Sequence, residues 1–149
     1  MGAMQRAVLL ALILTPVGLT VSWSAPPPAP QQPANKTQID RGRYLVEEVA
    51  RCPECHTPRD SQGNLERDRW LQGAPIWIMP VQHIQHWAER APALAGLPSY
   101  SDEQAERVLE QGTGPEGETI RPPMHTYHLS PDDAKAIIAY LRSLPSSPE

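Results

Sequence analysis

The five residues Cys52-Pro53-Glu54-Cys55-His56 restrict the architectures open to this chain more than any other segment does. Two cysteines with two residues between them, and a histidine directly after the second, are typical of covalent haem attachment. Each thiol can form a thioether bond to one vinyl group of the porphyrin, and the adjoining imidazole of His56 then lies under the iron as an axial ligand. The motif therefore predicts one covalent haem c, held by Cys52, Cys55 and His56.

A thiol–disulfide exchange pair is the main alternative for the same motif. Cys52 would then be the nucleophile and Cys55 the resolving thiol, because a thiol at a helix N-terminus has a lowered pKa. Such pairs usually lie among strand–helix–strand units, and the sequence contains no convincing strand pattern. A structural disulfide is a weaker alternative, since a gap of two residues strains the bond.

A zinc site would need two more ligands besides the cysteines. The available imidazole pairs are His83 with His86 and His125 with His128. Each pair has only two residues between its imidazoles, which is tighter than in the usual zinc finger, and the first pair is also far from Cys55. The spacing therefore favours haem over zinc.

The charge balance argues against nucleic acid as a partner. The chain of 149 residues has 13 Lys and Arg residues against 17 Asp and Glu residues, a formal net charge of -4, and nucleic-acid binding requires a basic surface. A mildly acidic surface instead suits a basic docking surface on a redox partner protein. The 18 prolines and the lack of phenylalanine predict long irregular loops around an aliphatic core.

Residues 1–24 have the pattern of a signal peptide or an N-terminal membrane anchor. Arg6 precedes an apolar run at residues 7–21, which is short beside the roughly 20 residues that span a bilayer. Residues 4–23 approach that length and would be the anchor if the segment is kept. Residues 25–36 form a proline-rich linker with an extended conformation. Either alternative predicts a periplasmic or other extracytoplasmic domain, which could be anchored to a membrane.

The first predicted helix runs from Thr37 to Arg51 and delivers Cys52 directly to the haem. Thr37 is its expected N-cap. Apolar residues recur at helical spacing along one face, and Gly42 lies in that face. Because glycine has no side chain, Gly42 would let another helix approach closely.

Two later helices have clear ends. Ser101 and Gln104 form a capping box for the first of them, and Gly112 ends it. The last helix begins after Ser130, with Pro131 at its first position, and ends before Pro145. Its apolar face consists of Ala134, Ile137, Ile138 and Leu141. We expect Tyr140 of the same helix to pack against Gly42, so that the first and last helices cross.

The middle of the chain has weaker signals. We expect a short helix from His83 to Arg90, ended by Pro92. The second ring nitrogen of His56 needs an acceptor, and the carbonyl group of Pro58 is the nearest candidate. One indole N–H could reach a haem propionate. Three tryptophans are expected in the core or in the wall of the haem pocket: Trp70, Trp77 and Trp87.

Met124 is the candidate for the sixth iron ligand. A thioether is a soft, neutral donor that stabilises reduced iron and raises the potential. Pro122 and Pro123 stiffen the backbone before it, and a strong helix signal follows. Met79, also beside a proline, is the alternative. Any of the four histidines of the possible zinc pairs would lower the potential instead.

These features together resemble the class I cytochrome c family, from about Thr37 to Leu144. The resemblance rests on Gly42 and Tyr44-Leu45 before the cysteine motif, on Pro123-Met124 followed by Tyr127, and on the segment from Asp133 to Leu144. The chain is similar to the single-haem cytochrome c subunits of bacterial periplasmic dehydrogenases. Residues 74–86 do not match the loop that relatives often have.

The resemblance implies an all-α fold of three to five helices around one covalent haem, with the N- and C-terminal helices crossing. The domain would cover residues 37–145, followed by a tail at 146–149. The resemblance also implies His56 and Met124 on the haem axis.

We therefore expect a one-electron carrier, or a haem subunit of an oxidoreductase complex, with protein partners as electron donor and acceptor. Iron with both axial positions filled has no open site for a substrate, which argues against catalysis. Two alternatives stay open: an exported thiol–disulfide oxidoreductase using Cys52 and Cys55, and a ligand-binding haem sensor if Met124 does not bind the iron.

Overall fold

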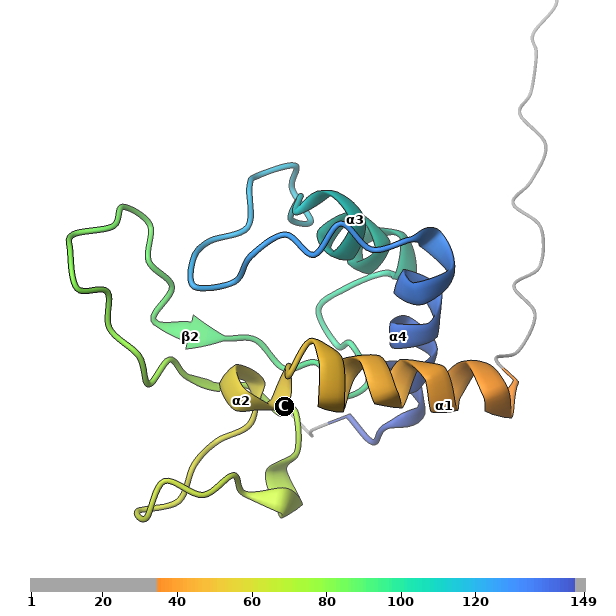
Figure 1. The fold of residues 1–149 in the computed structure, drawn as a ribbon, viewed down its shortest axis with the longest axis horizontal. Coiled ribbons are helices and arrows are strands. Elements are labelled where there is room, and N and C mark those ends of the chain that lie inside the picture. Colours follow the sequence, from red (N-terminus) through yellow and green to blue (C-terminus); the bar gives the residue numbers. More distant parts are fainter. Residues whose placement is uncertain (1–34, 147–149) are drawn as a thin grey trace, which may run out of the picture. The chain divides into compact units, whose positions relative to one another are not determined.

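Helices joined by long irregular loops make up the computed structural model, which describes residues 35–146 (Figure 1). The predicted signal peptide or anchor, residues 25–34 of the linker and residues 147–149 of the tail lie outside this range. No helix within 35–146 is long and apolar enough to cross a membrane. The elements are α1 (Lys36–Tyr44), a π-helical turn (Leu45–Val49), α2 (Pro53–His56), a 3-10 turn (Arg67–Arg69), β1 (Ala74–Pro75), β2 (Arg90–Ala91), α3 (Asp102–Gln111) and α4 (Pro131–Ser143).

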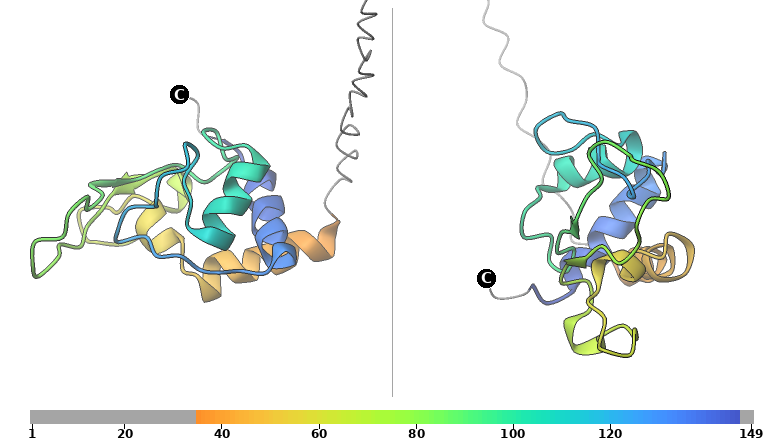
Figure 2. Two further views of the ribbon diagram at one scale, coloured as in Figure 1. Left: turned by 90° about the horizontal axis from the view of Figure 1, so that it is seen from above. Right: turned by 90° about the vertical axis from the view of Figure 1, so that its left-hand side faces the viewer.

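Helix α1 crosses α4, as the sequence predicts (Figures 1 and 2). Gly42 is buried at the crossing, where a Cβ atom would meet the carbonyl oxygen of Ala136 and the Cβ atom of Tyr140. Beside this contact, Arg41 Nε and Nη2 donate to the two carboxylate oxygens of Asp133 at 2.9 and 3.1 Å. The crossing is therefore fixed by one close backbone approach and one bidentate ion pair.

Both ends of the first helix differ from the prediction. Asn35, not Thr37, is the N-cap, and its side chain accepts a hydrogen bond from the backbone N–H of Gln38 at 2.8 Å. At the other end the helix widens into the π-helical turn, after which Arg51 has a left-handed backbone with φ of 55°. The helix therefore does not run straight into Cys52, because the chain turns at Arg51 first.

The caps of α3 and α4 confirm their predicted ends. The Ser101 hydroxyl accepts from the N–H of Gln104, whose side chain accepts from the N–H of Ser101. Gly112 ends α3 with φ of 68°, and the Ser130 hydroxyl caps α4 at the N–H of Asp133. Helices α3 and α4 pack on each other in all views (Figures 1 and 2).

The buried core joins these helices to the segment around residue 95. Arg142 at the end of α4 holds that segment, since its guanidinium donates to the carbonyl oxygens of Gly96, Leu97 and Tyr100 at 2.7 to 3.1 Å. The core consists of Leu45, Val46, Leu71, Ala95, Leu97, Ala105, Ala136, Ile137, Ile138, Tyr140 and Leu141.

The predicted helix from His83 to Arg90 is absent, and this prediction was wrong. Strands β1 and β2 pair antiparallel, with Ala74 opposite Ala91, and residues 76–89 form an irregular loop between them. Within the loop's second half, only Trp87 and Ala88 are even half-buried. A helix there would have no apolar face to bury, and isolated helices of this length are unstable in water.

Candidate functional site

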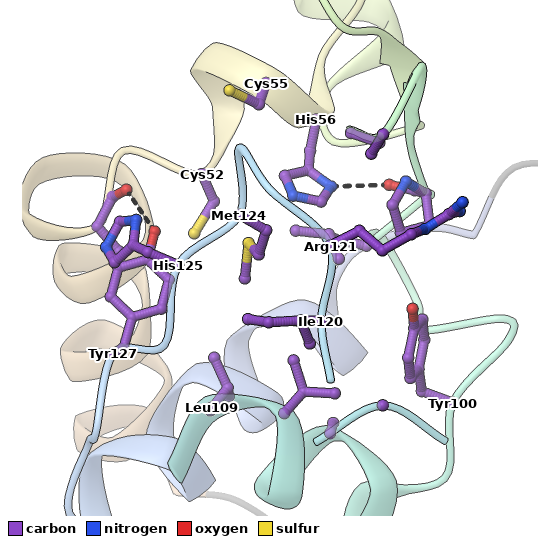
Figure 3. A pocket seen from close by; sticks show the side chains of 18 of the residues that line it. Cys52, Cys55, His56, Tyr100, Leu109, Ile120, Arg121, Met124, His125 and Tyr127 are labelled. Atoms are coloured by element: carbon purple, nitrogen blue, oxygen red, sulfur yellow. Dashed lines mark hydrogen bonds between the residues drawn. The ribbon is translucent and has the colours of Figure 1, made fainter. Parts of the chain in front are cut away.

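A cavity of about 660 Å³ lies between α2, α3, α4 and the segment that follows α3 (Figure 3). This volume is within the range of cofactor sites, which run from roughly 300 to 1,000 Å³. Its walls are mainly aliphatic, and the contributing side chains include Leu94, Leu97, Val108, Leu109, Ile120 and Ile137. The cavity can therefore accommodate a large, mostly apolar group.

The cysteine motif forms one wall of this cavity. Cys52 precedes α2 and Cys55 lies within it, and both are free thiols that line the cavity. The side chain of Glu54, between them, binds Arg51 at 2.8 Å and Arg59 at 2.6 Å. These ion pairs and the folded α2 present both thiols to one space (Figure 3).

The ionisation of the two thiols argues against disulfide exchange. Burial raises the pKa of Cys52 to about 11. Burial, and then the negative charge of Glu54, also raise the pKa of Cys55. A nucleophilic cysteine needs a lowered pKa to form its thiolate near neutral pH, so neither thiol has the environment that an oxidoreductase pair requires.

His56 is 7% exposed and its ring is fixed in orientation. Nδ1 lies 2.8 Å from the carbonyl oxygen of Pro92, which can only accept a hydrogen bond, so Nδ1 has the hydrogen. Burial lowers the pKa of His56, which favours the neutral ring. The remaining nitrogen, Nε2, therefore has a free lone pair suited to binding a metal.

The sequence suggested the carbonyl group of Pro58 as the hydrogen-bond acceptor for His56. The acceptor in the structure is Pro92. The carbonyl oxygen of Pro58 instead accepts from the N–H of Glu66 at 2.9 Å. Pro92 is 36 residues from His56 in the sequence. It reaches His56 because β2, which directly precedes Pro92, pairs with β1. No local sequence signal connects the two residues.

The structure brings Met124 and His56 into the same cavity and keeps Met79 out of it. The Met124 side chain enters the cavity from the segment between α3 and α4 (Figure 3). Tyr127 holds this segment against the end of the π-helical turn, because the Tyr127 hydroxyl donates to the carbonyl oxygen of Ala50 at 3.2 Å. Met79 is 84% exposed and is not among the residues that line the cavity.

The three tryptophans are not wall residues of the cavity. Trp70 packs against the core, while Trp77 is exposed and donates its indole N–H to the carbonyl oxygen of Glu54 at 3.0 Å. Trp87 adjoins Ala88, which lines the cavity, and its buried indole nitrogen has no hydrogen-bond partner among residues 35–146.

Several polar side chains of the lining were not predicted from the sequence, among them Arg90, Tyr100, Glu118 and Arg121. Arg90 and Arg121 are exposed at the rim, and Tyr100 is half-buried. Only Arg121 had a usable signal, because it directly precedes Pro122 and the candidate ligand segment.

The described residues offer no alternative metal site. No group of three His, Cys, Asp or Glu side chains within 35–146 is arranged to hold a metal ion. All four histidines that were considered for zinc are exposed: His83, His86, His125 and His128.

Comparison with known proteins points to a family that binds a cofactor of this size. Residues 39–145 match the family model described as cytochrome c. The chain is 37% identical over 118 residues to the fructose dehydrogenase cytochrome subunit of Gluconobacter japonicus, a match that covers 74% of this chain and 23% of the relative. It is 32% identical over 117 residues to a diheme cytochrome c-type protein of Cereibacter sphaeroides, covering 72% of this chain and 36% of the relative.

A third relative is the cytochrome c subunit of the quinone alcohol dehydrogenase of Gluconobacter oxydans. It is 31% identical over 128 residues, and the match covers 75% of this chain and 25% of the relative. The chain thus spans only about a quarter to a third of the length of these relatives.

Proposed function

The chain belongs to the cytochrome c family, and we propose that it is a periplasmic one-electron carrier or haem subunit with His56 and Met124 as axial ligands. The family binds haem c covalently, and the spacing of Cys52 and Cys55 fits one haem. The observation that carries the proposal is the buried, neutral imidazole of His56, with Nδ1 bound to Pro92, on the wall of an apolar cavity of about 660 Å³.

The residues present fit a covalent haem. Both thiols line the cavity, so Cys52 and Cys55 would form the two thioether bonds. His56 would supply Nε2 to the iron, because its other ring nitrogen is already occupied. The aliphatic walls would contact the apolar faces of the porphyrin ring, which removes that surface from water.

Met124 would supply the second axial donor. Its side chain lies in the cavity, and the hydrogen bond from Tyr127 to Ala50 holds the segment in place. A thioether donor raises the potential of the iron. If His56 and Met124 both bind the iron, they would leave no position open to a substrate or a gaseous ligand, which disfavours the sensor alternative.

Two arginines at the rim of the cavity, and Trp87 directly beside its lining residue Ala88, are suited to the haem carboxylates. The buried indole N–H of Trp87 lacks a partner among the described residues, and such donors are costly to leave unsatisfied. A propionate would accept from it, and Arg90 and Arg121 at the rim would balance the negative charge. Trp87 would then be the tryptophan whose indole N–H reaches a propionate.

A haem held by these residues would supply one-electron redox chemistry. The aliphatic walls would exclude water from it, and His56 and Met124 would bind its iron. The relatives' names refer to fructose and alcohol dehydrogenases, so we propose a dehydrogenase or a quinol-oxidising complex as the electron donor. An oxidase, a reductase or a reaction centre would be the acceptor, and residues 1–24 would export the domain or anchor it at the membrane.

The test is the mass and the spectrum of the matured full-length protein. We expect the mass of one haem added to the chain and a Soret band that survives acid–acetone extraction. Cys52→Ser with Cys55→Ser should lose both, while Met79→Leu should retain both. A mature protein without added porphyrin mass would refute the haem assignment.

A further inference from the structure

An apolar loop projects from the domain between β1 and β2. Residues 76–89, here called the β1–β2 loop, extend away from the helices in Figure 1 and in the left view of Figure 2, where they are drawn in green. Four exposed large hydrophobic side chains belong to it: Trp77 at 58%, Met79 at 84%, Val81 at 104% and Ile84 at 44%. Apolar side chains gathered in this way on a surface usually mark an interaction site.

Exposure alternates along the first half of the loop. Trp77, Met79 and Val81 are exposed, while the residues between them, Ile78 and Pro80, are half-buried. This is the period of an extended chain, in which successive side chains point to opposite faces. One face of the segment is thus wholly apolar and directed into solvent.

The loop has only one charged residue, Glu89, at its end next to β2. Residues 70–88 contain no Asp, Glu, Lys or Arg, although a fifth of the whole chain is charged. Before Glu89, its polar side chains are amides and imidazoles: Gln82, His83, Gln85 and His86. A surface with so few charges would gain little electrostatic attraction from a charged docking partner.

We propose that the β1–β2 loop docks the domain on a lipid bilayer, with its tip at the depth of the headgroups. The tip is convex, since Val81 at 104% has no neighbour that covers it. A protein partner would need a matching concave pocket, whereas a bilayer surface accommodates any convex apolar tip. The shape and the scarcity of charge therefore favour a bilayer over a protein.

The backbone of the loop sets the depth of insertion. Between Trp77 and Trp87 the described structure has no backbone–backbone hydrogen bond, and unpaired backbone groups do not enter the hydrocarbon core. Water and lipid headgroups can form hydrogen bonds with these backbone groups at the interface. Apolar side chains at the interface insert about 5–10 Å into the boundary between headgroups and acyl chains. Tryptophan is enriched at this depth, and Trp77 at the start of the loop is exposed.

The loop is attached firmly enough to orient the cavity. The Trp77 indole N–H donates to the carbonyl oxygen of Glu54 at 3.0 Å, and the guanidinium of Arg59 lies 4.7 Å from the centre of the Trp77 ring. At the loop's other end, Ala88 lines the cavity. Docking through the tip would therefore hold the cysteine side of the cavity in a fixed relation to the membrane.

The test uses the full-length holoprotein and a photoreactive label placed in the loop. Val81→Cys is labelled with a thiol-directed benzophenone and irradiated with vesicles of phosphatidylcholine, with or without phosphatidylglycerol. We expect lipid adducts at residue 81, with similar yields on both vesicles and at raised salt. Ser61→Cys, which is exposed on a different loop, is the matched control and should give few adducts.

A second comparison identifies the side chains responsible. With the label at Gln85→Cys, the added changes Met79→Gln, Val81→Gln and Ile84→Gln should lower the lipid-adduct yield by about tenfold, since they remove the apolar surface that binding would bury. Tyr44→Gln with Val49→Gln, two exposed apolar residues elsewhere, should leave the yield unchanged.

This readout reports the loop itself even if residues 4–23 also hold the protein at the vesicle. Lipid adducts no more frequent at residue 81 than at residue 61 would overturn the proposal. So would adducts to a second copy of the chain in place of lipid, or adducts that require phosphatidylglycerol. Haem content and the visible spectrum are measured in parallel and do not depend on the outcome.

Discussion

Gly42 of α1 lies so close to the main-chain oxygen of Ala136 in α4 that no side chain fits between the two helices. The approach brings Tyr140 of α4 to within hydrogen-bonding reach of Glu47 in the π-helical turn. That turn leads through Arg51 to the cysteine motif. The helix crossing and the position of the cavity wall are therefore set by the same contact.

Gly42→Ala should destabilise the holoprotein by about 1–3 kcal/mol or more. The added methyl group would overlap the Ala136 oxygen, which is backbone and cannot rotate away, so the helices must separate, and overpacking of this kind typically costs about 1–3 kcal/mol or more. The measurement is thermal or denaturant unfolding of the haem-loaded protein. Thr37→Ala, at an exposed position of the same helix, should change stability by less than about 0.5 kcal/mol. Equal stability of the two variants would contradict this account of the crossing.

The sequence predicted those parts of the fold that depend on local chemistry. The caps at Ser101 and Ser130 and the close approach at Gly42 all follow from residue types at fixed spacing. The hydrogen bond from His56 to Pro92 could not be predicted, because it depends on how two strands of two residues each pair across the chain. Local spacing does not encode such a long-range contact.

The β1–β2 loop was mispredicted for a related reason. The segment from His83 to Arg90 has residues that tolerate a helix, but most of its side chains are exposed. Helix propensity alone does not stabilise a short segment without burial. The candidate site depends less on such contacts, because the motif contains three of its residues; the structure places Met124 in the lining of the same cavity.

Met124→His should lower the midpoint potential by a sizeable part of the roughly 0.8 V range that axial ligands cover, because imidazole stabilises reduced iron less than a thioether does. Met124→Ala should leave the sixth position open, so that the reduced protein binds carbon monoxide at neutral pH. Redox titration and difference spectra measure both effects. Met79→Leu is the matched control and should alter neither, since Met79 is 84% exposed. A normal potential in Met124→His would exclude Met124 as the ligand.

Trp87→Phe should lower the stability of the holoprotein by about 1–3 kcal/mol. The change removes a buried indole N–H that has no protein partner among the described residues. If a haem propionate accepts from it, a hydrogen bond to a charged group is lost. If nothing accepts, removing an unsatisfied buried donor should instead stabilise the protein. The sign of the change in unfolding free energy therefore decides whether the propionate is bound there.

Stability should fall between about pH 10 and pH 12, in part through Tyr140. Burial, and then its hydrogen bond to Glu47, raise the pKa of Tyr140 to about 12, whereas an unfolded tyrosine has a pKa near 10. In this pH window the folded state keeps the Tyr140 proton while the unfolded state loses it. The contribution of Tyr140 to the free energy of unfolding is therefore complete below pH 10 and declines as the pH rises.

Tyr140→Phe should make the alkaline decline shallower, at a cost of about 1 kcal/mol at neutral pH from the lost hydrogen bond. It should not abolish the decline, because burial also raises the pKa of Tyr127 to about 12. Unfolding curves recorded at several pH values measure both slopes, with exposed Tyr44→Phe as the control. An unchanged slope in Tyr140→Phe would show that its ionisation is not linked to folding.

Without haem, the chain should not maintain its tertiary structure. The cavity of about 660 Å³ has aliphatic walls, and walls without a filling group lose the dispersion contacts that stabilise a core. The net stability of a domain is only about 5–15 kcal/mol, and the aliphatic core described here is small. A haem-free variant with Cys52→Ser and Cys55→Ser should therefore give poorly dispersed NMR signals and no cooperative unfolding, whereas the haem-loaded protein should show both features. Well-dispersed signals from the haem-free variant would mean that the helices α1, α3 and α4 hold the fold by themselves, with the cavity already formed before the cofactor arrives.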